Sequence, residues 1–455
     1  MKKNSMFNRR EALKVMGLGS GLLLGGMPLA AQESQTILSH PASHKHARIV
    51  IVGGGTAGMI AVARTRRAAP NAQIVLIAPN ELHRYQPGAL FVAAGMATAE
   101  EYIRKSASLV PDDVKWLKEK VISFDPENNL LIADKSGKII YDILIVALGA
   151  KYDYEEIDGL KEDMIGKNGI ASLYMGDSID GNDRGGDMTR LLFNKLLKDT
   201  STKNKPLKIL FSEPPTPIKG AGTSLSLLFL YNHILKKVHK KKDVTFTYIT
   251  AHEKLLEFDK FDVALKKELK KHTNIKAVYG KKLVGINVEE KKATFAHDNS
   301  HEEIGYDLLH ITPPIVAPKV MRDSLLALKE GAQKGWMEVD PSTLRHPKYK
   351  NVFGLGDVIN IPYAKSGGAA QQQGIILQDN IAAALEGEKL TYHYNGYTVA
   401  PVVTAYGKVL LAEYNNKKAL PTFFLSPYEP RIPWWLLQRY FMPWAYFNLM
   451  MRGMM

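Results

Sequence analysis

A glycine-rich loop between an apolar run and an alanine-rich segment constrains the fold of this chain most. Residues 49–52 read IVIV, which is typical of a central parallel strand covered on both faces, and residues 59–67 predict the helix that follows. In the G-x-G-x-x-G pattern between them, Gly53 permits the tight turn, Gly55 lets a pyrophosphate approach the backbone and Gly58 lets the helix pack on the strand. The loop therefore predicts a dinucleotide site, whose other members are Gly54, Thr56 and Ala57.

Two later stretches favour FAD over NAD as the dinucleotide. Residues 138–150 predict a strand that returns the chain to the nucleotide, and residues 350–362 predict a strand that ends in a Gly-Asp pair. In flavoproteins with two dinucleotide domains, such a pair brings an acceptor to the ribityl chain and an amide toward the phosphate. The cofactor residues assigned in this part of the site are Val121, Ala147, Gly149, Gly356 and Asp357.

The ribose end of the site departs from the usual pattern. The second strand of the predicted domain ends in the sequence LIAPNE, where Ala78 replaces the acid that usually binds the adenosine ribose. Asn80 and Glu81 are the alternative ribose ligands nearby. We therefore expect this end of the cofactor to be bound more weakly or in a different arrangement.

Composition excludes several classes of function. The 455 residues are 45% hydrophobic and 23% charged, as in an ordinary folded protein of two or three domains. The net charge of +14 includes lysine runs at 236–242 and 266–271, which are typical of solvated helix faces or of docking on an anionic membrane. No basic motif is interleaved with aromatic residues, so we expect no nucleic-acid partner. The chain contains no cysteine, which excludes disulfides, thiolate metal sites and thiol nucleophiles.

The N-terminal segment has the features of a targeting signal. An arginine pair, Arg9-Arg10, precedes a glycine-rich apolar stretch and small residues, which resembles a twin-arginine export signal. Residues 1–31 therefore predict a signal peptide, residues 32–47 a linker, and the protein a periplasmic location; an ordinary secretory signal or an uncleaved anchor is the alternative. Three linker histidines lack acidic or cysteine partners, so we predict no metal site there; they are His40, His44 and His46.

Long blocks of the chain resemble a known family. The sequences HRYQPGALFVAAG, GWMEVDPSTLRHPKYKNVFGLGDV and GYTVAPVVTAYGKVLLAEY are similar to those of sulfide:quinone oxidoreductases, in particular to the mitochondrial-like branch. The resemblance implies an α/β fold with two tandem Rossmann-like (doubly wound) dinucleotide-binding domains and a C-terminal membrane-facing segment. The implied parts are an FAD domain in two pieces, 48–160 and 311–390, a second Rossmann-like domain, 161–310, and a C-terminal interfacial region, 391–455.

The chain departs from this family at both redox cysteines. The family carries one in a PxKCAG block, where this chain has Gly220, and the other in GYTSCP, where it has Ala400. The sequence GAGTSL at 220–225 is also a poor NAD loop, because seven residues separate it from the strand-like LKILFS and because prolines interrupt the intervening chain. We read it as an altered substrate loop.

Three polar residues match family positions near the flavin. Lys365 is expected at the pyrimidine edge of the flavin, where a cation stabilises the anionic reduced ring and can help to bind a quinone. Gln86 and Gln373 match further positions near the cofactor. Lys365 is accordingly the candidate catalytic residue.

The C-terminal segment predicts contact with a membrane surface. Its longest uncharged run, residues 440–451, has twelve residues, whereas a spanning helix needs ~20. Aromatic residues beside arginines suit an interfacial helix pair, and packing on the protein's own core or on a dimer partner is the alternative.

Together these features predict a peripherally membrane-bound FAD oxidoreductase. We expect it to oxidise a small electron donor and to reduce a quinone, without the cysteine-based sulfide mechanism. The sequence leaves open electron transfer to a cytochrome, an NADH:quinone reductase, a non-catalytic flavin-binding module, and assembly into a homo-oligomer.

Overall fold

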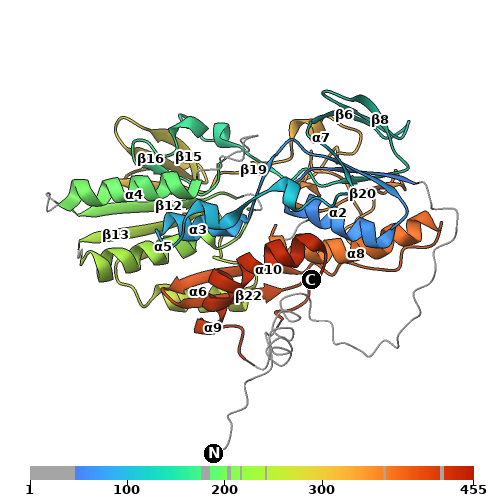
Figure 1. Ribbon diagram of the computed structural model, residues 1–455. Helices are drawn as coiled ribbons and strands as arrows, with labels where there is room; N and C mark the ends of the chain where they lie inside the picture. The colour runs from blue at the N-terminus through green and yellow to red at the C-terminus, as the bar shows by residue number, and fades with distance from the viewer. Residues whose placement is uncertain are drawn as a thin grey trace, which may run out of the picture.

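The computed structural model describes residues 47–175, 185–201, 206–215, 218–240, 243–361, 365–420 and 425–455. The predicted signal peptide, residues 1–31, lies outside this part of the chain, as do the three linker histidines. Two parallel sheets with covering helices make up the body of the molecule (Figure 1). The predicted α/β class with two tandem Rossmann-like domains is confirmed.

The first domain is built on the apolar run at 49–52. It forms β1 (Arg48–Val52), the central strand of a parallel sheet of order β20-β9-β1-β2-β5. Ile49 and Ile51 pack into the core beside the helices, and Val50 and Val52 into the core on the opposite face, so the run is buried on both sides. The other strands are β2 (Gln73–Ile77), β5 (Lys115–Leu117), β9 (Ile143–Val146) and β20 (Val352–Gly354).

Two helices from distant parts of the chain cover one face of this sheet. They are α2 (Thr56–Ala68) and α8 (Gly367–Leu385), which lie side by side. A Cβ built on Gly374 would lie 2.2 Å from Cγ2 of Ile60, so the glycine lets the helices approach closely. The opposite face is covered by an antiparallel sheet of β6 (Val121–Asp125), β7 (Leu130–Ala133) and β8 (Gly137–Ile140).

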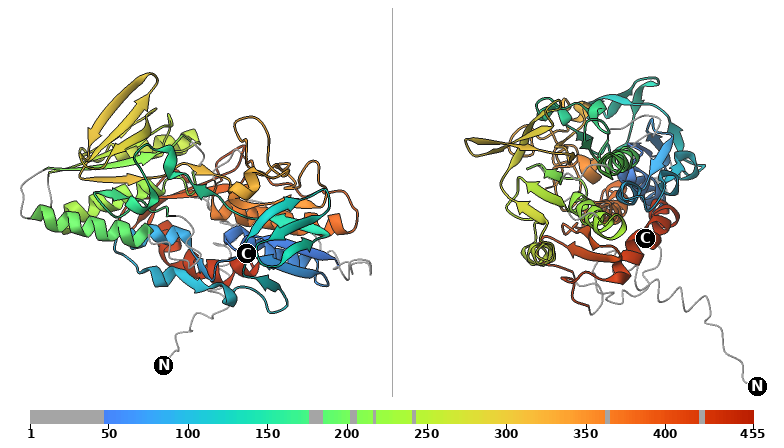
Figure 2. Two further views of the ribbon diagram at one scale, coloured as in Figure 1. Left: turned by 90° about the horizontal axis from the view of Figure 1, so that it is seen from above. Right: turned by 90° about the vertical axis from the view of Figure 1, so that its left-hand side faces the viewer.

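The second domain repeats the parallel arrangement. Its sheet has the order β11-β18-β12-β13-β14 and is flanked by helices. The strands are β11 (Ile170–Ala171), β12 (Leu207–Glu213), β13 (Val244–Thr250), β14 (Ile275–Val278) and β18 (Leu308–Ile311). The helices are α4 (Gly185–Ser201), α5 (Thr223–His233) and α6 (Asp259–Leu269). Figure 2 shows an antiparallel sheet projecting from this domain, formed by β15 (Lys282–Asn287), β16 (Lys292–His297) and β17 (Ser300–Gly305).

The chain passes between the two domains on a pair of short strands. It leaves the first domain through β10 (Lys151–Tyr152) and returns through β19 (Ile315–Val316), and these strands pair in antiparallel fashion. The two crossings are therefore hydrogen-bonded to each other. The domain boundaries proposed above at 160 and 310 remain a prediction.

The C-terminal elements pack on both domains. A hairpin of β21 (Thr398–Ala405) and β22 (Lys408–Tyr414) lies on α5, where the Val403 amide donates to Oγ of Ser226 at 2.9 Å. A helical segment follows, consisting of α9 (Ile432–Leu436), the π-helical turn η9 (Leu437–Phe441), α10 (Met442–Asn448) and η10 (Met450–Arg452). The guanidinium of Arg439 anchors it by donating to Tyr102 Oη at 2.9 Å and to the Met96 carbonyl at 2.7 Å. Among the described residues, no helix is long and apolar enough to cross a membrane.

The close approach of α2 and α8 predicts the outcome of a simple substitution. Gly374→Ala places a methyl group against the stiff, buried side chain of Ile60, so we expect the free energy of unfolding to fall by about 1–2 kcal/mol despite the better helix propensity of alanine. Gly305→Ala is the control, because the nearest atom to its new Cβ lies at 3.9 Å. Denaturant unfolding measures both; equal stability of the two variants would contradict the tight packing.

Candidate flavin site

The glycine-rich loop is folded as a cradle for a phosphate group. Gly53 has φ +109°, and a Cβ on it would lie 2.3 Å from the Ala147 carbonyl oxygen; one on Gly58 would lie 1.7 Å from the Gly53 oxygen. By contrast, a Cβ on Gly55 would meet nothing within 4 Å. No side chain caps the N-terminus of α2, and its first turn has no acidic residue. The space before Gly55 and the uncapped helix N–H groups fit the pyrophosphate of a dinucleotide.

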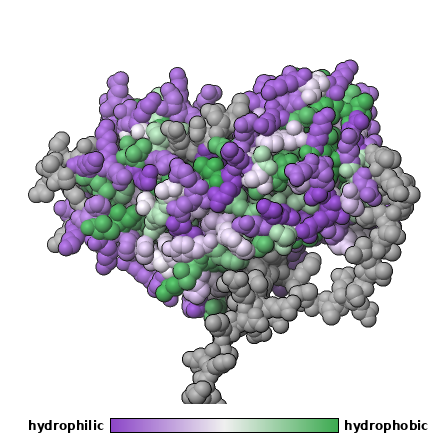
Figure 3. Space-filling view, viewed as in Figure 1, coloured by the Kyte–Doolittle hydropathy of each residue, from purple (hydrophilic) through white to green (hydrophobic). Residues whose placement is uncertain are grey.

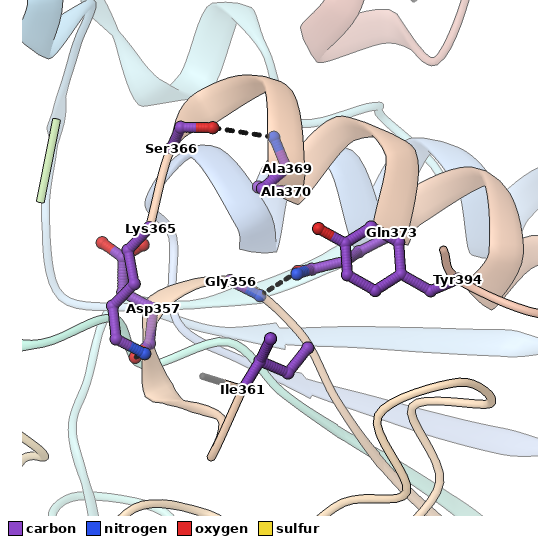
Figure 4. Close-up of a pocket in the computed structure, with 9 residues that line it drawn as sticks. All are labelled: Gly356, Asp357, Ile361, Lys365, Ser366, Ala369, Ala370, Gln373 and Tyr394. Carbon is purple, nitrogen blue, oxygen red and sulfur yellow. Dashed lines mark hydrogen bonds between the residues drawn. The ribbon is translucent and has the colours of Figure 1, made fainter. Parts of the chain in front are cut away.

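The Gly-Asp pair lies directly against this cradle. A Cβ on Gly356, whose φ is +77°, would lie 2.5 Å from the Cβ of Ala57. The Gly356 amide donates to Oε1 of Gln373 at 2.7 Å, which holds the loop to α8 (Figure 4). The fold thus joins the first and last thirds of the chain at one site. A small cavity beside it is lined by Gly356, Asp357, Ile361, Lys365, Ser366, Ala369, Ala370, Gln373 and Tyr394.

Lys365 is a buried cation at this cavity. It is 7% exposed, and its Nζ donates to the carbonyl oxygens of Asp357 at 2.8 Å and Ile359 at 3.0 Å. The same atom lies 4.3 Å from the ring centroid of Trp336. Burial lowers the pKa of Lys365 to about 8, and the charge of Asp357 opposes that shift. The side chain therefore remains mainly an ammonium at pH 7, in a place where few water molecules screen it.

A second lysine connects the altered loop to the Gly-Asp pair. Nζ of Lys219 lies 3.7 Å from a carboxylate oxygen of Asp357 and 5.6 Å from the ring centroid of Tyr152. The amide of the next residue, Gly220, donates to the Lys365 carbonyl at 3.0 Å. The altered loop thus lies beside the candidate flavin site. The sequence reasoning missed Lys219 and Trp336; a lysine beside Gly220 was a usable signal, whereas Trp336 has no local one.

The two positions at which the resemblance expects redox cysteines lie in elements that pack together. Gly220 has φ +72° and precedes α5, whereas Ala400 is 2% exposed in β21. A Cβ on Gly222 would lie 2.5 Å from Cγ2 of Val402, so the loop rests on this strand. At Gly220, any other residue would be held in the left-handed region, which costs roughly 1–2 kcal/mol.

A buried carboxyl group lies beneath the altered loop. Glu213 ends β12 and accepts hydrogen bonds from Oγ of Ser224, at 3.2 Å, and from the Tyr248 hydroxyl. Burial raises the pKa of Glu213 to about 7, and both hydrogen bonds oppose the shift. The group can therefore exchange a proton near neutral pH. No sequence pattern pointed to it, because a single acid at a strand end has no distinctive pattern.

The remaining predicted cofactor residues lie in different surroundings. The Ala147 amide donates to the Val52 carbonyl at 2.8 Å, and Gly149 follows with φ +70°, so both lie at the end of the central strands. Val121 is buried in the core on the face of the sheet away from α2, and Gln86 is exposed. Their contacts with the cofactor stay predictions.

The ribose end shows no acid in the place of Ala78. Ala78 is buried, and its Cβ lies 2.7 Å from a Cβ built on Gly54. Glu81 forms an exposed ion pair with Lys118 at 2.7 Å, and this partner lowers the pKa of Glu81.

The described residues contain no cluster of three histidine, aspartate or glutamate side chains that could hold a metal ion.

The fold and site define a flavin-dependent oxidoreductase. The family described as pyridine nucleotide-disulphide oxidoreductase matches residues 47–173. The chain is 31% identical to the mitochondrial sulfide:quinone oxidoreductase of Mus musculus, over 90% of this chain and 87% of the relative. It is also 31% identical to that of Dictyostelium discoideum, over 89% and 86%. The chain belongs to the sulfide:quinone oxidoreductase family, and its cofactor is FAD.

Solved structures share the fold. The sulfide:quinone oxidoreductase of Aquifex aeolicus matches with a TM-score of 0.71 at 20% identity, over 88% of this chain and 92% of that one. A chain of the mitochondrial ATP synthase of Tetrahymena thermophila matches with a TM-score of 0.75 at 20% identity, over 93% and 98%.

The predicted periplasmic location is wrong. The relatives from Mus musculus and Dictyostelium discoideum are named as mitochondrial proteins, which points to a mitochondrial location and not to twin-arginine export. Basic residues before an apolar stretch occur in several kinds of targeting segment, so the arginine pair did not identify one of them.

The cradle geometry predicts different results for two glycines. Gly55→Val should leave a folded protein without FAD, because its side chain enters the open space before the helix N-terminus. Gly58→Val should instead lower the melting temperature strongly, because its side chain would overlap the Gly53 carbonyl. Absorbance near 450 nm and thermal unfolding distinguish the two. Stoichiometric FAD in a folded Gly55→Val protein would show that the pyrophosphate lies elsewhere.

Proposed function

We propose that this protein oxidises a small electron donor at FAD and passes the electrons to a quinone, without a persulfide on the protein. The observation that supports this most is the buried Lys365 ammonium between the Gly-Asp pair and the altered loop. Bound FAD supplies a two-electron acceptor that can react directly with a small nucleophile. The protein's own residues then have to position the donor and hold charge.

Lys365 and Lys219 would supply that charge. Carbonyl oxygens hold the Lys365 ammonium in place, so no large rearrangement is needed when negative charge develops nearby. Lys219, directly before the altered loop, is attracted to Asp357 and would favour an anionic donor. Glu213, below the loop, can take up a proton near neutral pH.

The donor would have to react without a thiol. The relatives are named for sulfide and quinone, but this chain has Gly220 and Ala400 where the resemblance expects the redox cysteines. A thiolate is the nucleophile that such cysteine chemistry needs, and neither residue can provide one. A small anionic nucleophile, of which sulfide is one, would need no such group if it gave its two electrons to bound FAD directly.

The quinone would arrive from a membrane surface. Four large apolar side chains of the C-terminal segment, which follow one another at intervals of four residues, are between 51% and 61% exposed: Ile432, Leu436, Tyr440 and Trp444. We call them the apolar stripe. Apolar side chains gather along the lower edge of the molecule in Figure 3, where Figure 1 places α9. Such a stripe on a helix too short to span suits insertion into the interfacial layer of a bilayer.

A non-catalytic flavin module is the second candidate. The loss of both cysteines favours it, and a chain of this fold is part of the Tetrahymena thermophila ATP synthase. Electron transfer to a cytochrome differs from the main proposal only in the oxidant. A second dinucleotide at the altered loop is disfavoured, because Gly222 is packed against Val402 and leaves no approach for a pyrophosphate.

Sulfide should reduce the flavin slowly. Because the protein has no thiol, the rate of flavin bleaching in anaerobic stopped-flow mixing should rise linearly with sulfide concentration and should not saturate. The double substitution Gly220→Cys and Ala400→Cys tests the missing pair of thiols, and we expect neither single substitution to speed flavin reduction by sulfide. Gly220→Cys should also destabilise the fold by roughly 1–2 kcal/mol because of its left-handed φ of +72°. Fast, saturable bleaching in the natural protein, with many quinone turnovers, would contradict the thiol-free mechanism. Absence of any flavin reduction by a panel of donors would favour the non-catalytic module.

Charges in the apolar stripe should weaken binding to lipid. The double substitution Tyr440→Glu and Trp444→Glu removes two exposed apolar groups, so we expect at least a tenfold weaker partition onto anionic vesicles and slower reduction of a long-chain quinone. Reduction of a water-soluble quinone should be unchanged. Val263→Glu, at an apolar residue that is 66% exposed on α6, is the matched control. Equal sedimentation of the natural protein, the double variant and Val263→Glu with vesicles would contradict the interfacial role.

A further inference from the structure

A chain of buried hydrogen bonds joins the C-terminal segment to the nucleotide loop. The hydroxyl group of Tyr446, in α10, lies 2.7 Å from Oγ1 of Thr56 and 2.7 Å from Nε2 of His83. Nδ1 of His83 lies 3.1 Å from the carbonyl oxygen of Gly54. Both loop residues, Gly54 and Thr56, belong to the glycine-rich cradle. Tyr446 therefore contacts the loop although it lies 390 residues from Thr56 in the sequence.

The direction of each bond follows from the chemistry of its partners. Burial lowers the pKa of His83 to about 4, so the ring is neutral at pH 7 and has one N–H. The Gly54 carbonyl only accepts, so Nδ1 carries the hydrogen and Nε2 must accept from Tyr446. The Tyr446 oxygen is then free to accept from the Thr56 hydroxyl. A single orientation satisfies all three bonds.

Aromatic packing and two arginines hold the segment in the same place. The Tyr446 ring stacks on His83 at a centroid distance of 5.7 Å, and Phe447 meets Tyr446 edge-on at 5.0 Å. From α2, Arg64 donates to the Met455 carbonyl, and Arg67 donates to the Arg452 carbonyl at 3.4 Å. Figures 1 and 2 show the C-terminal helices beside α2. The helix that presents Trp444 to the outside thus presents Tyr446 to the nucleotide loop.

We infer that residues 432–455 complete the FAD site, and that Tyr446 is a positioning residue that fixes the nucleotide loop through Thr56 and His83. The hydrogen-bonded loop keeps the Gly55 backbone and the first turn of α2 in the conformation that receives the pyrophosphate. Removing the segment would therefore loosen FAD as well as the contact with a membrane. Docking of the apolar stripe and retention of FAD are coupled through one helix.

The test compares hydroxyl removal with loss of packing in the full-length holoprotein. Tyr446→Phe keeps the ring and removes the hydroxyl, so we expect FAD to dissociate about tenfold faster, measured by the rise in flavin fluorescence after dilution. Tyr392→Phe, which removes the hydroxyl of an exposed tyrosine outside residues 432–455, should leave the rate unchanged. Phe447→Leu keeps the Tyr446 hydroxyl and weakens the packing of the two rings, so it should lower the melting temperature but speed FAD dissociation less than Tyr446→Phe does.

A double-substitution cycle identifies the chain of bonds as the cause. Thr56→Val removes the first donor, so the double variant with Tyr446→Phe should lose no more FAD affinity than Tyr446→Phe alone. Additive losses would overturn the inference, because they would mean that the two hydroxyl groups act separately. An unchanged dissociation rate in Tyr446→Phe would overturn it, as would equal loosening by Phe447→Leu.

Discussion

The contact between the first turn of α2 and the end of β1 determines how the rest of the site is arranged. A Cβ on Gly58 would lie 1.7 Å from the Gly53 carbonyl oxygen, so helix and strand meet as closely as two backbones can. This approach directs the N-terminus of α2 at the open space before Gly55. The Gly356 loop, α8 and the C-terminal segment then assemble around α2, and each brings one part of the site.

Sequence patterns predicted the parts of the site that are local in the chain. The cradle at 53–58 and the Gly356-Asp357 pair could be assigned because a strand, a turn and a helix follow one another within about twenty residues. The contact of Lys365 with Trp336 could not, because nothing in either neighbourhood specifies its partner. The link from Tyr446 to His83 spans 363 residues and depends on how whole elements pack. The error in location had another origin, since short basic and apolar segments resemble one another across targeting systems.

Ordinary packing surrounds the two positions at which the resemblance expects redox cysteines. Gly220 adopts a left-handed conformation that a cysteine would strain, and Ala400 is enclosed in the hairpin that rests on α5. Charged groups lie beside the candidate flavin site. Lys219 lies near the carboxylate of Asp357, and the ammonium group of Lys365 donates to the backbone carbonyl of the same residue.

The paired crossings β10 and β19 have a mechanical consequence. Two chains that cross a junction separately can each act as a swivel, but two that are hydrogen-bonded to each other behave as a ribbon, which bends in one direction and resists twisting. The bond from Gly220 to the Lys365 carbonyl adds a tie between the domains at another point. The two domains are thus connected at two separate points, and we expect them to move together rather than to open about a single hinge.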